Sequence, residues 1–174
     1  MPAESQQSNK RGQLLVEAMI AISVMVIGLL GIFSLTSQSL GLYRVAYEQY
    51  VAVNLAAEGI EVVKNMIDTN VIAGSVQWNE GLAIDGDFGI QYDSRSLDAT
   101  LQSKNLLYDA STSLYNYTSG TPTNFKRVIK IKNIDPPGLP DQIDEIQVNS
   151  VVTWRTRRGL DLQINLEDHF FNWR

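Results

Sequence analysis

The sequence has 174 residues, of which 44% are apolar and 19% charged, and this composition is typical of a folded chain and excludes wholesale disorder. It contains no cysteine, which excludes disulfides and thiolate metal sites. The net charge of −5 argues against a protein that binds nucleic acid through general basicity.

The first feature along the chain is an apolar segment close to the N-terminus. Residues 1–12 are polar, whereas Leu14 to Leu35 form a run of 22 residues with one charge, Glu17. A helix rises about 1.5 Å per residue, so roughly 20 residues cross a hydrocarbon core of about 30 Å. A soluble helix in so small a domain would not be apolar on all sides. The run therefore predicts a transmembrane helix.

The charges beside this segment predict its orientation. Lys10 and Arg11 precede the apolar run, and polar residues 36–39 follow it. Positive charge stays on the cytoplasmic side, so we expect the N-terminus inside and residues 37–174 outside.

A helical pattern continues beyond the apolar run. No proline occurs between Pro2 and Pro122, and we expect one continuous helix from about Leu14 to about Thr69. Its second half should be amphipathic, because apolar residues recur at heptad-like spacing with Lys64 as the interruption. The stripe that we expect to pack consists of Tyr43, Ala46, Tyr50, Val53, Ala57, Ile60 and Ile67.

After Asn70 the apolar residues shift towards a period of two. The alternation in Leu160–Glu167 predicts a half-buried strand, and Ile146 to Trp154 show one apolar face. Arg155–Gly159 supplies a turn, so residues 143–168 are predicted to form a β-hairpin.

Weaker strand signals lie between the helix and this hairpin. Phe125–Ile134 predicts a strand near a sheet edge, since three lysines interrupt it. Residues 135–140 contain three prolines and predict a loop. Short strands are expected at Gly89–Asp93 and Leu114–Tyr117.

These elements together predict an α+β fold, in which a long N-terminal helix packs through its distal half on a small antiparallel sheet. The predicted regions are a cytoplasmic leader at 1–12, a transmembrane helix at 13–36, its amphipathic extension at 37–69, and an extracytoplasmic β-rich domain at 70–174.

The residues around the start of the apolar run resemble a known processing signal. Lys10 to Ala21 is similar to the prepilin peptidase signature of type IV pilins, competence pseudopilins and type II secretion pseudopilins, with a basic leader, a glycine, and a glutamate as fifth residue of the mature chain. This resemblance implies recognition of Lys10, Arg11, Gly12 and Gln13, and cleavage after Gly12. It also implies N-methylation of Gln13, where the family usually carries Phe or Met.

The same resemblance gives Glu17 a role in assembly. In the family, the glutamate of one subunit is thought to face the N-terminal amine of a neighbouring subunit. An opposite charge compensates part of the desolvation that Glu17 alone would suffer. Leu55–Asn65, Phe125–Ile131 and Val152–Trp154 are also similar to a subgroup of minor prepilins.

The resemblance implies a structural, non-enzymatic subunit of a type IV pilus or a type II secretion-like pseudopilus, and the similarity to the subgroup of minor prepilins implies a minor one. Its implied partners are a prepilin peptidase, other pilins, and an inner-membrane assembly platform with a cytoplasmic ATPase. Two alternatives stay open: a membrane-anchored extracytoplasmic binding or sensor domain that never polymerises, and a protein secreted with a signal peptide. The sequence does not identify the machine.

Enzymatic, metal-binding and nucleic-acid-binding signals are weak. His169 is the one histidine, and no Gly-rich phosphate loop, HExxH or GxSxG motif occurs. The basic turn with Arg155 and Arg157 is interpreted as a solubilising hairpin tip, and nucleic acid is not an expected partner. We predict no cofactor. Acidic residues in the loops could supply oxygen ligands for Ca²⁺, but solvated acidic turns are the commoner explanation. These residues are Asp85, Asp87, Asp135, Asp141, Asp144 and Glu145.

Overall fold

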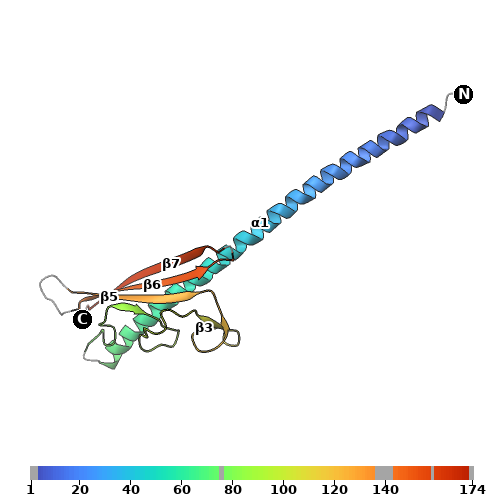
Figure 1. The fold of residues 1–174 in the computed structure, drawn as a ribbon. Helices are drawn as coiled ribbons and strands as arrows, with labels where there is room; N and C mark the ends of the chain where they lie inside the picture. Colours follow the sequence, from blue (N-terminus) through green and yellow to red (C-terminus); the bar gives the residue numbers. More distant parts are fainter. Residues whose placement is uncertain (1–3, 75–76, 136–142, 158, 173–174) are drawn as a thin grey trace. The chain divides into compact units, whose positions relative to one another are not determined.

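The computed structural model describes residues 4–74, 77–135, 143–157 and 159–172, with side chains from Gly12 onward. One helix, α1 (Glu4–Ala73), is followed by two antiparallel sheets, which confirms the α+β fold (Figure 1). The chain divides into two compact units, Met1–Ala46 and Tyr47–Arg174. The described residues of the first unit are all helical, and the second unit contains the end of α1 and both sheets.

Helix α1 is longer than expected at both ends. It begins at Glu4 rather than near Leu14, because residues 4–11 are mostly good helix formers and each adds a hydrogen bond to a helix that already exists. It ends at Ala73, where Gly74 takes a left-handed φ of 68° and its N–H donates to the Val71 carbonyl at 3.3 Å.

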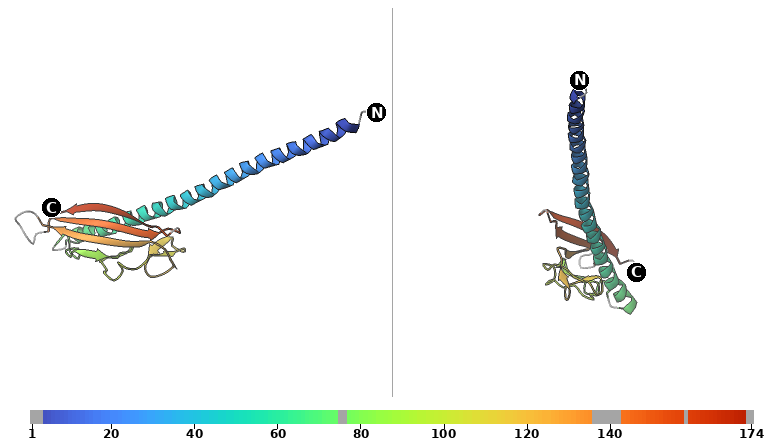
Figure 2. Two further views of the ribbon diagram at one scale, coloured as in Figure 1. Left: turned by 45° about the horizontal axis from the view of Figure 1, so that its top comes forward. Right: turned by 90° about the vertical axis from the view of Figure 1, so that its right-hand side faces the viewer.

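The larger sheet has the strand order β1-β5-β6-β7 (Figure 2). The predicted hairpin is confirmed as the pair β6 and β7, in the register Val148 opposite Asp168. The strand expected from residue 125 is confirmed as β5, and it lies near an edge because only the three-residue β1 lies beyond it. The strands of this sheet are β1 (Gly86–Phe88), β5 (Lys126–Ile134), β6 (Glu145–Arg155) and β7 (Asp161–Phe171).

The smaller sheet has the order β3-β2-β4, with β2 at Leu107–Asp109, β3 at Leu114–Asn116 and β4 at Thr121–Pro122. Strand β3 confirms the strand expected near Leu114. The loop expected at 135–140 lies, apart from Asp135, outside the described residues.

The strand expected at Gly89–Asp93 is wrong, because pairing with β5 stops at Phe88. Gly89 instead forms an isolated bridge with Asp98, in which its N–H donates to the Asp98 carbonyl at 2.8 Å. A Cβ at Gly89 would meet the backbone of Leu101 at 2.6 Å. From Gly89 on, the chain therefore pairs with Asp98 instead of β5, and the loop that contains Leu101 leaves no room for a side chain at Gly89.

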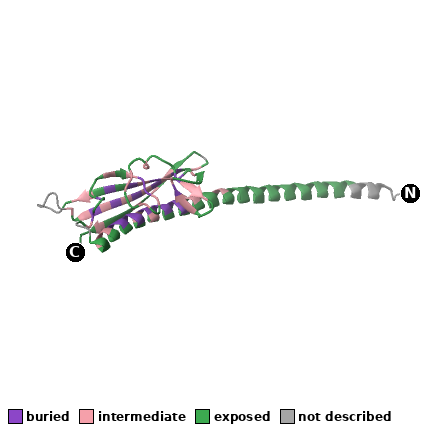
Figure 3. Cartoon of the chain, turned by 90° about the horizontal axis from the view of Figure 1, so that it is seen from below, coloured by how far each residue is buried: buried purple, intermediate pink, exposed green. Residues whose placement is uncertain are grey.

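The face of α1 that packs on the sheets is not the predicted stripe. Tyr50, Val53 and Ala57 are exposed, and among the predicted positions only Ile67 is buried. The packed face is broader than a heptad seam, with pairs of adjacent residues in successive turns (Figure 3). Small and apolar residues occur on both sides of this helix, so spacing alone selected the wrong side. The buried residues are Val51, Ala52, Leu55, Ala56, Gly59, Val62, Val63, Met66 and Ile67.

Candidate functional site: the apolar helix and its glutamate

The N-terminal unit carries an apolar surface with nothing packed on it. Every residue from 12 to 40 is exposed (Figure 3), including Leu14 at 64%, Ile27 at 70% and Phe33 at 75%. Water disfavours such a surface by about 25 cal/mol per Å² of apolar area. By length and composition, this part of α1 is a candidate membrane span.

Two hydroxyl groups within or beside this surface are satisfied by the helix itself. Ser23 Oγ donates to the Met19 carbonyl at 2.7 Å, and Thr36 Oγ1 donates to the Ile32 carbonyl at 2.9 Å. Both bonds reach back one helical turn, a pattern that hides a hydroxyl from apolar surroundings. These residues therefore need no partner outside the helix.

Glu17 differs from these residues. Its side chain is exposed on α1, and its carboxylate makes no hydrogen bond or ion pair with any described residue. A charged side chain within a spanning helix costs about 2.5–3.5 kcal/mol at the bilayer centre, less near the interface, and such groups usually have a partner. A partner for Glu17 would have to come from outside this chain or from a new group within it.

The residues of the predicted cleavage signal all lie within α1. Gly12 and Gln13 are exposed, and apart from the adjoining helix backbone and the two neighbouring residues no described atom lies within 4 Å of the place where a Cβ on Gly12 would be. Lys10 and Arg11 have helical backbone, and their side chains lie outside the described residues. Gln13 and Glu17 are four residues apart and so share one face of the helix.

A buried ion pair that the sequence analysis did not identify connects the helix to the large sheet. Arg127, on β5, is completely buried and donates through Nη1 to Glu58 Oε1 at 2.8 Å and to the Leu55 carbonyl at 2.9 Å. Its Nη2 donates to the Ile90 carbonyl at 2.7 Å. These bonds compensate part of the cost of desolvating the guanidinium, whose Nε has no hydrogen-bond partner among the described atoms, and they fix one position of α1 on the sheet. Period-two parity could have revealed Arg127, because it shares a strand face with Ile129.

Of the acidic residues considered for Ca²⁺, Asp85, Asp87 and Glu145 have protein partners. Asp85 accepts hydrogen bonds from Asn133, at 2.7 Å from the backbone N–H and 2.9 Å from the side chain, and these bonds lower the pKa of Asp85. Asp87 pairs with Lys130 at 3.3 Å. Asp141 lies outside the described residues. Within the described ranges, no group of three His, Asp or Glu side chains could hold a metal ion.

His169 lies on the outer face of β7 between two carboxylates. Its Nδ1 contacts Glu145, and its Nε2 lies 3.2 Å from Glu167 Oε1. The hydrogen bonds to Glu145 and then to Glu167 raise the pKa of His169. The side chain thus joins β6 and β7 at the surface.

No family model, curated protein or solved structure matches this chain. What the structure itself establishes is an α+β fold with an apolar N-terminal helix that could span a membrane.

Proposed function

We propose that this chain is a structural subunit of a type IV pilus or a type II secretion-like pseudopilus, matured by cleavage after Gly12 and assembled through its N-terminal helix. The observation that carries the proposal is the change of surface along α1. Residues 12–40 are exposed throughout, whereas the same helix buries one face of its segment from Val51 to Ile67 against its own sheets. One end of the helix thus packs in a folded domain. The apolar surface of the other end can contact lipid in the membrane and then neighbouring helices in a filament.

Glu17 gains a partner in such an assembly. Cleavage after Gly12 creates an α-amino group on Gln13, and an ammonium group beside a carboxylate favours the charged form of both. Pairing between neighbouring subunits would set their axial register. Burial of the apolar side chains stabilises the assembly but is non-directional, so it does not select a register. Within one subunit the same two groups are four residues apart on the helix, so pairing with a neighbour competes with pairing inside the chain.

The partners in this proposal follow from the processing and the topology. A prepilin peptidase at the membrane recognises Lys10, Arg11, Gly12 and Gln13, and Gln13 is the site of N-methylation. Other pilins contact the apolar helix, and an inner-membrane platform extracts the subunit into a filament. The subunit itself performs no catalysis in this scheme.

Mass spectrometry of the protein from its own host tests the maturation step. We expect an N-terminus at Gln13 in normal cells and an intact leader in cells without prepilin peptidase. An intact leader in normal cells would contradict the proposal and would favour a membrane-anchored binding or sensor domain.

Substitution of Glu17 tests the assembly step. Glu17→Ala should still be cleaved, but its recovery in sheared filaments should fall about tenfold or more, since each 1.4 kcal/mol of lost pairing is a factor of ten. Ser23→Ala is the matched control, because Ser23 bonds only to its own helix. Normal incorporation of Glu17→Ala would exclude the pairing role, and loss of its cleavage would instead place Glu17 in peptidase recognition.

A further inference from the structure

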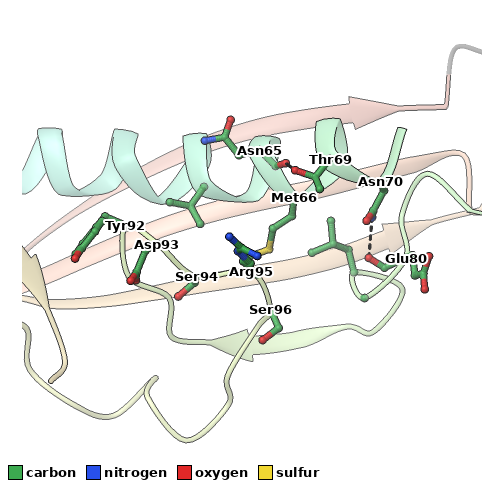
Figure 4. Close-up of a pocket in the computed structure, with 13 residues that line it drawn as sticks. Asn65, Met66, Thr69, Asn70, Glu80, Tyr92, Asp93, Ser94, Arg95 and Ser96 are labelled. Atoms are coloured by element: carbon green, nitrogen blue, oxygen red, sulfur yellow. Dashed lines mark hydrogen bonds between the residues drawn. The ribbon is translucent and has the colours of Figure 1, made fainter. Parts of the chain in front are cut away.

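The domain formed by Tyr47–Arg174 contains a half-open cleft between the end of α1 and two loops (Figure 4). Its volume of about 580 Å³ falls in the range of roughly 300–1,000 Å³ that small-molecule sites occupy. The cleft has a buried apolar floor, formed by Val62, Met66 and Leu82, which are 4%, 9% and 1% exposed. The loop containing Tyr92 and Arg95 forms the opposite wall.

Both loops of the cleft are held in place by hydrogen bonds. Asn70 on α1 donates from Nδ2 to the carbonyls of Trp78 at 3.2 Å and Glu80 at 2.9 Å, which fixes the first loop. In the second loop, the Gln91 N–H donates to Ser94 Oγ at 2.9 Å, and Gln91 Nε2 donates to Asp93 Oδ1 at 2.7 Å. The walls are therefore formed before any ligand arrives, which lowers the entropy cost of binding.

Other polar side chains that line the cleft take no part in such hydrogen bonds. Among the described residues, no hydrogen bond or ion pair involves the side chains of Tyr92, Arg95 or Glu80. In Figure 4, Arg95 lies between Tyr92 at one end of the cleft and Glu80 at the other. The cleft thus presents both hydrogen-bond donors and hydrogen-bond acceptors above an apolar floor.

We propose that this cleft binds a neutral saccharide. A sugar ring has an apolar C–H face, which suits the floor and the ring of Tyr92, and a rim of hydroxyls that both donate and accept. Arg95 supplies donors to those hydroxyls, while Glu80 and Asp93 supply acceptors. Tyr92 is 43% exposed, so its ring is available for stacking.

The charges of the cleft disfavour anionic ligands. Among the described residues that line it, Arg95 is the one cation, and the two carboxylates of Glu80 and Asp93 outweigh this charge. A phosphate or polyanion would meet net repulsion from these carboxylates. A ligand that carries hydroxyls and no net charge avoids this cost.

Saturation-transfer NMR on the full chain tests the proposal, with the protein in phosphatidylcholine nanodiscs free of glycolipid and glycoside detergent. The probes are methyl β-glucoside, methyl β-galactoside, cellobiose, lactose and chitobiose, with the dipeptide glycyl-leucine as a non-sugar probe. We expect transfer to at least one saccharide. Tyr92→Ala and Arg95→Met should each weaken its binding about tenfold, the effect of about 1.4 kcal/mol.

Two exposed residues outside the cleft provide matched controls. Tyr47→Ala and Arg155→Met remove the same side-chain types and should leave saccharide binding unchanged. Circular dichroism melting should show that all four variants stay folded, because exposed substitutions usually change stability by less than about 0.5 kcal/mol.

Three results would overturn the proposal. The first is no transfer to any saccharide at roughly 10 mM, a concentration that would detect binding weaker than 1 mM, or about −4 kcal/mol. The second is saccharide binding that Tyr92→Ala and Arg95→Met leave intact. The third is Arg95-dependent binding of glycyl-leucine alone, which would assign the cleft to peptides.

Discussion

At the residue scale, Gly59 lies where α1 closely approaches the large sheet. A Cβ at this position would overlap Ser150 Oγ and would lie 2.8 Å from Ile129 Cδ1. Ser150 Oγ is buried and has no hydrogen-bond partner among the described atoms. The glycine is therefore retained for space, although it costs the helix about 1 kcal/mol relative to alanine.

We expect Gly59→Ala to destabilise the protein, because overpacking costs about 1–3 kcal/mol and exceeds the gain in helix propensity. The measurement is the urea midpoint of the full chain in nanodiscs. Adding Ser150→Ala should recover part of the loss, since it removes the nearest atom of the clash. A midpoint that rises in the single variant Gly59→Ala would show that the sheet moves away easily.

His169 predicts a pH dependence of stability. Its pKa is raised above the ordinary 6.5, so its contribution is complete below pH 6.5 and is lost as the pH rises through the raised pKa. The pKa of Glu167 is lowered below 4.5 by hydrogen bonds from Asn149 first and then His169, so its contribution is lost only as the pH falls through that lowered pKa. The interactions of His169 and Glu167 should therefore stabilise the fold most at a pH between the lowered pKa of Glu167 and the raised pKa of His169.

Thermal melting of the wild type and of His169→Gln at about pH 5.5 and about pH 8.5 measures this effect. The melting temperature of the wild type should exceed that of His169→Gln by more at the lower pH than at the higher pH. Equal differences at the two pH values would mean that His169 does not bind its proton more tightly in the folded state. Asn172→Gln, one residue beyond the end of β7 and without a titrating group, serves as the control.

At the scale of the element, the packed face of α1 can be tested with two adjacent alanines. Ala56 is completely buried against the sheet, whereas Ala57, which the heptad spacing placed on the packed face, is exposed. Ala56→Leu should cost about 1–3 kcal/mol because the core has no room for it, and Ala57→Leu should change stability by less than about 0.5 kcal/mol. Urea unfolding of the two variants measures these changes. A larger loss of stability in Ala57→Leu than in Ala56→Leu would mean that the face predicted from the heptad spacing is the one that packs.

At the scale of the whole molecule, the absence of cysteine allows the topology to be measured with single substitutions. In cells that lack prepilin peptidase, Ser103→Cys should react with a membrane-impermeant maleimide, and Ser8→Cys should react only after the cells are permeabilised. This expectation follows from the positive-inside rule, by which Lys10 and Arg11 should keep the N-terminus in the cytoplasm. Labelling of Ser8→Cys in intact cells would contradict this orientation.

The sequence by itself determined the elements whose signal is local. Twenty-two residues from Leu14 to Leu35 with one charge suffice to predict an apolar helix, and period-two alternation predicted β6 and β7 together with their turn. The roles of Gly12, Gln13 and Glu17 rest on the resemblance to prepilins and stay predictions, because they depend on an enzyme and on neighbouring subunits.

Only the tertiary structure decided which surfaces meet. Both sides of α1 carry small and apolar residues, so the face that packs is selected by contact with β5 and β6, and these strands are distant in sequence. The same reason applies to Arg127, whose partners Glu58 and Ile90 come from the helix and from a loop. The cleft beside Arg95 likewise exists only because separate segments fold against α1. Periodicity reports the local conformation of a segment, whereas the choice of its partners depends on the free energy of the assembled core.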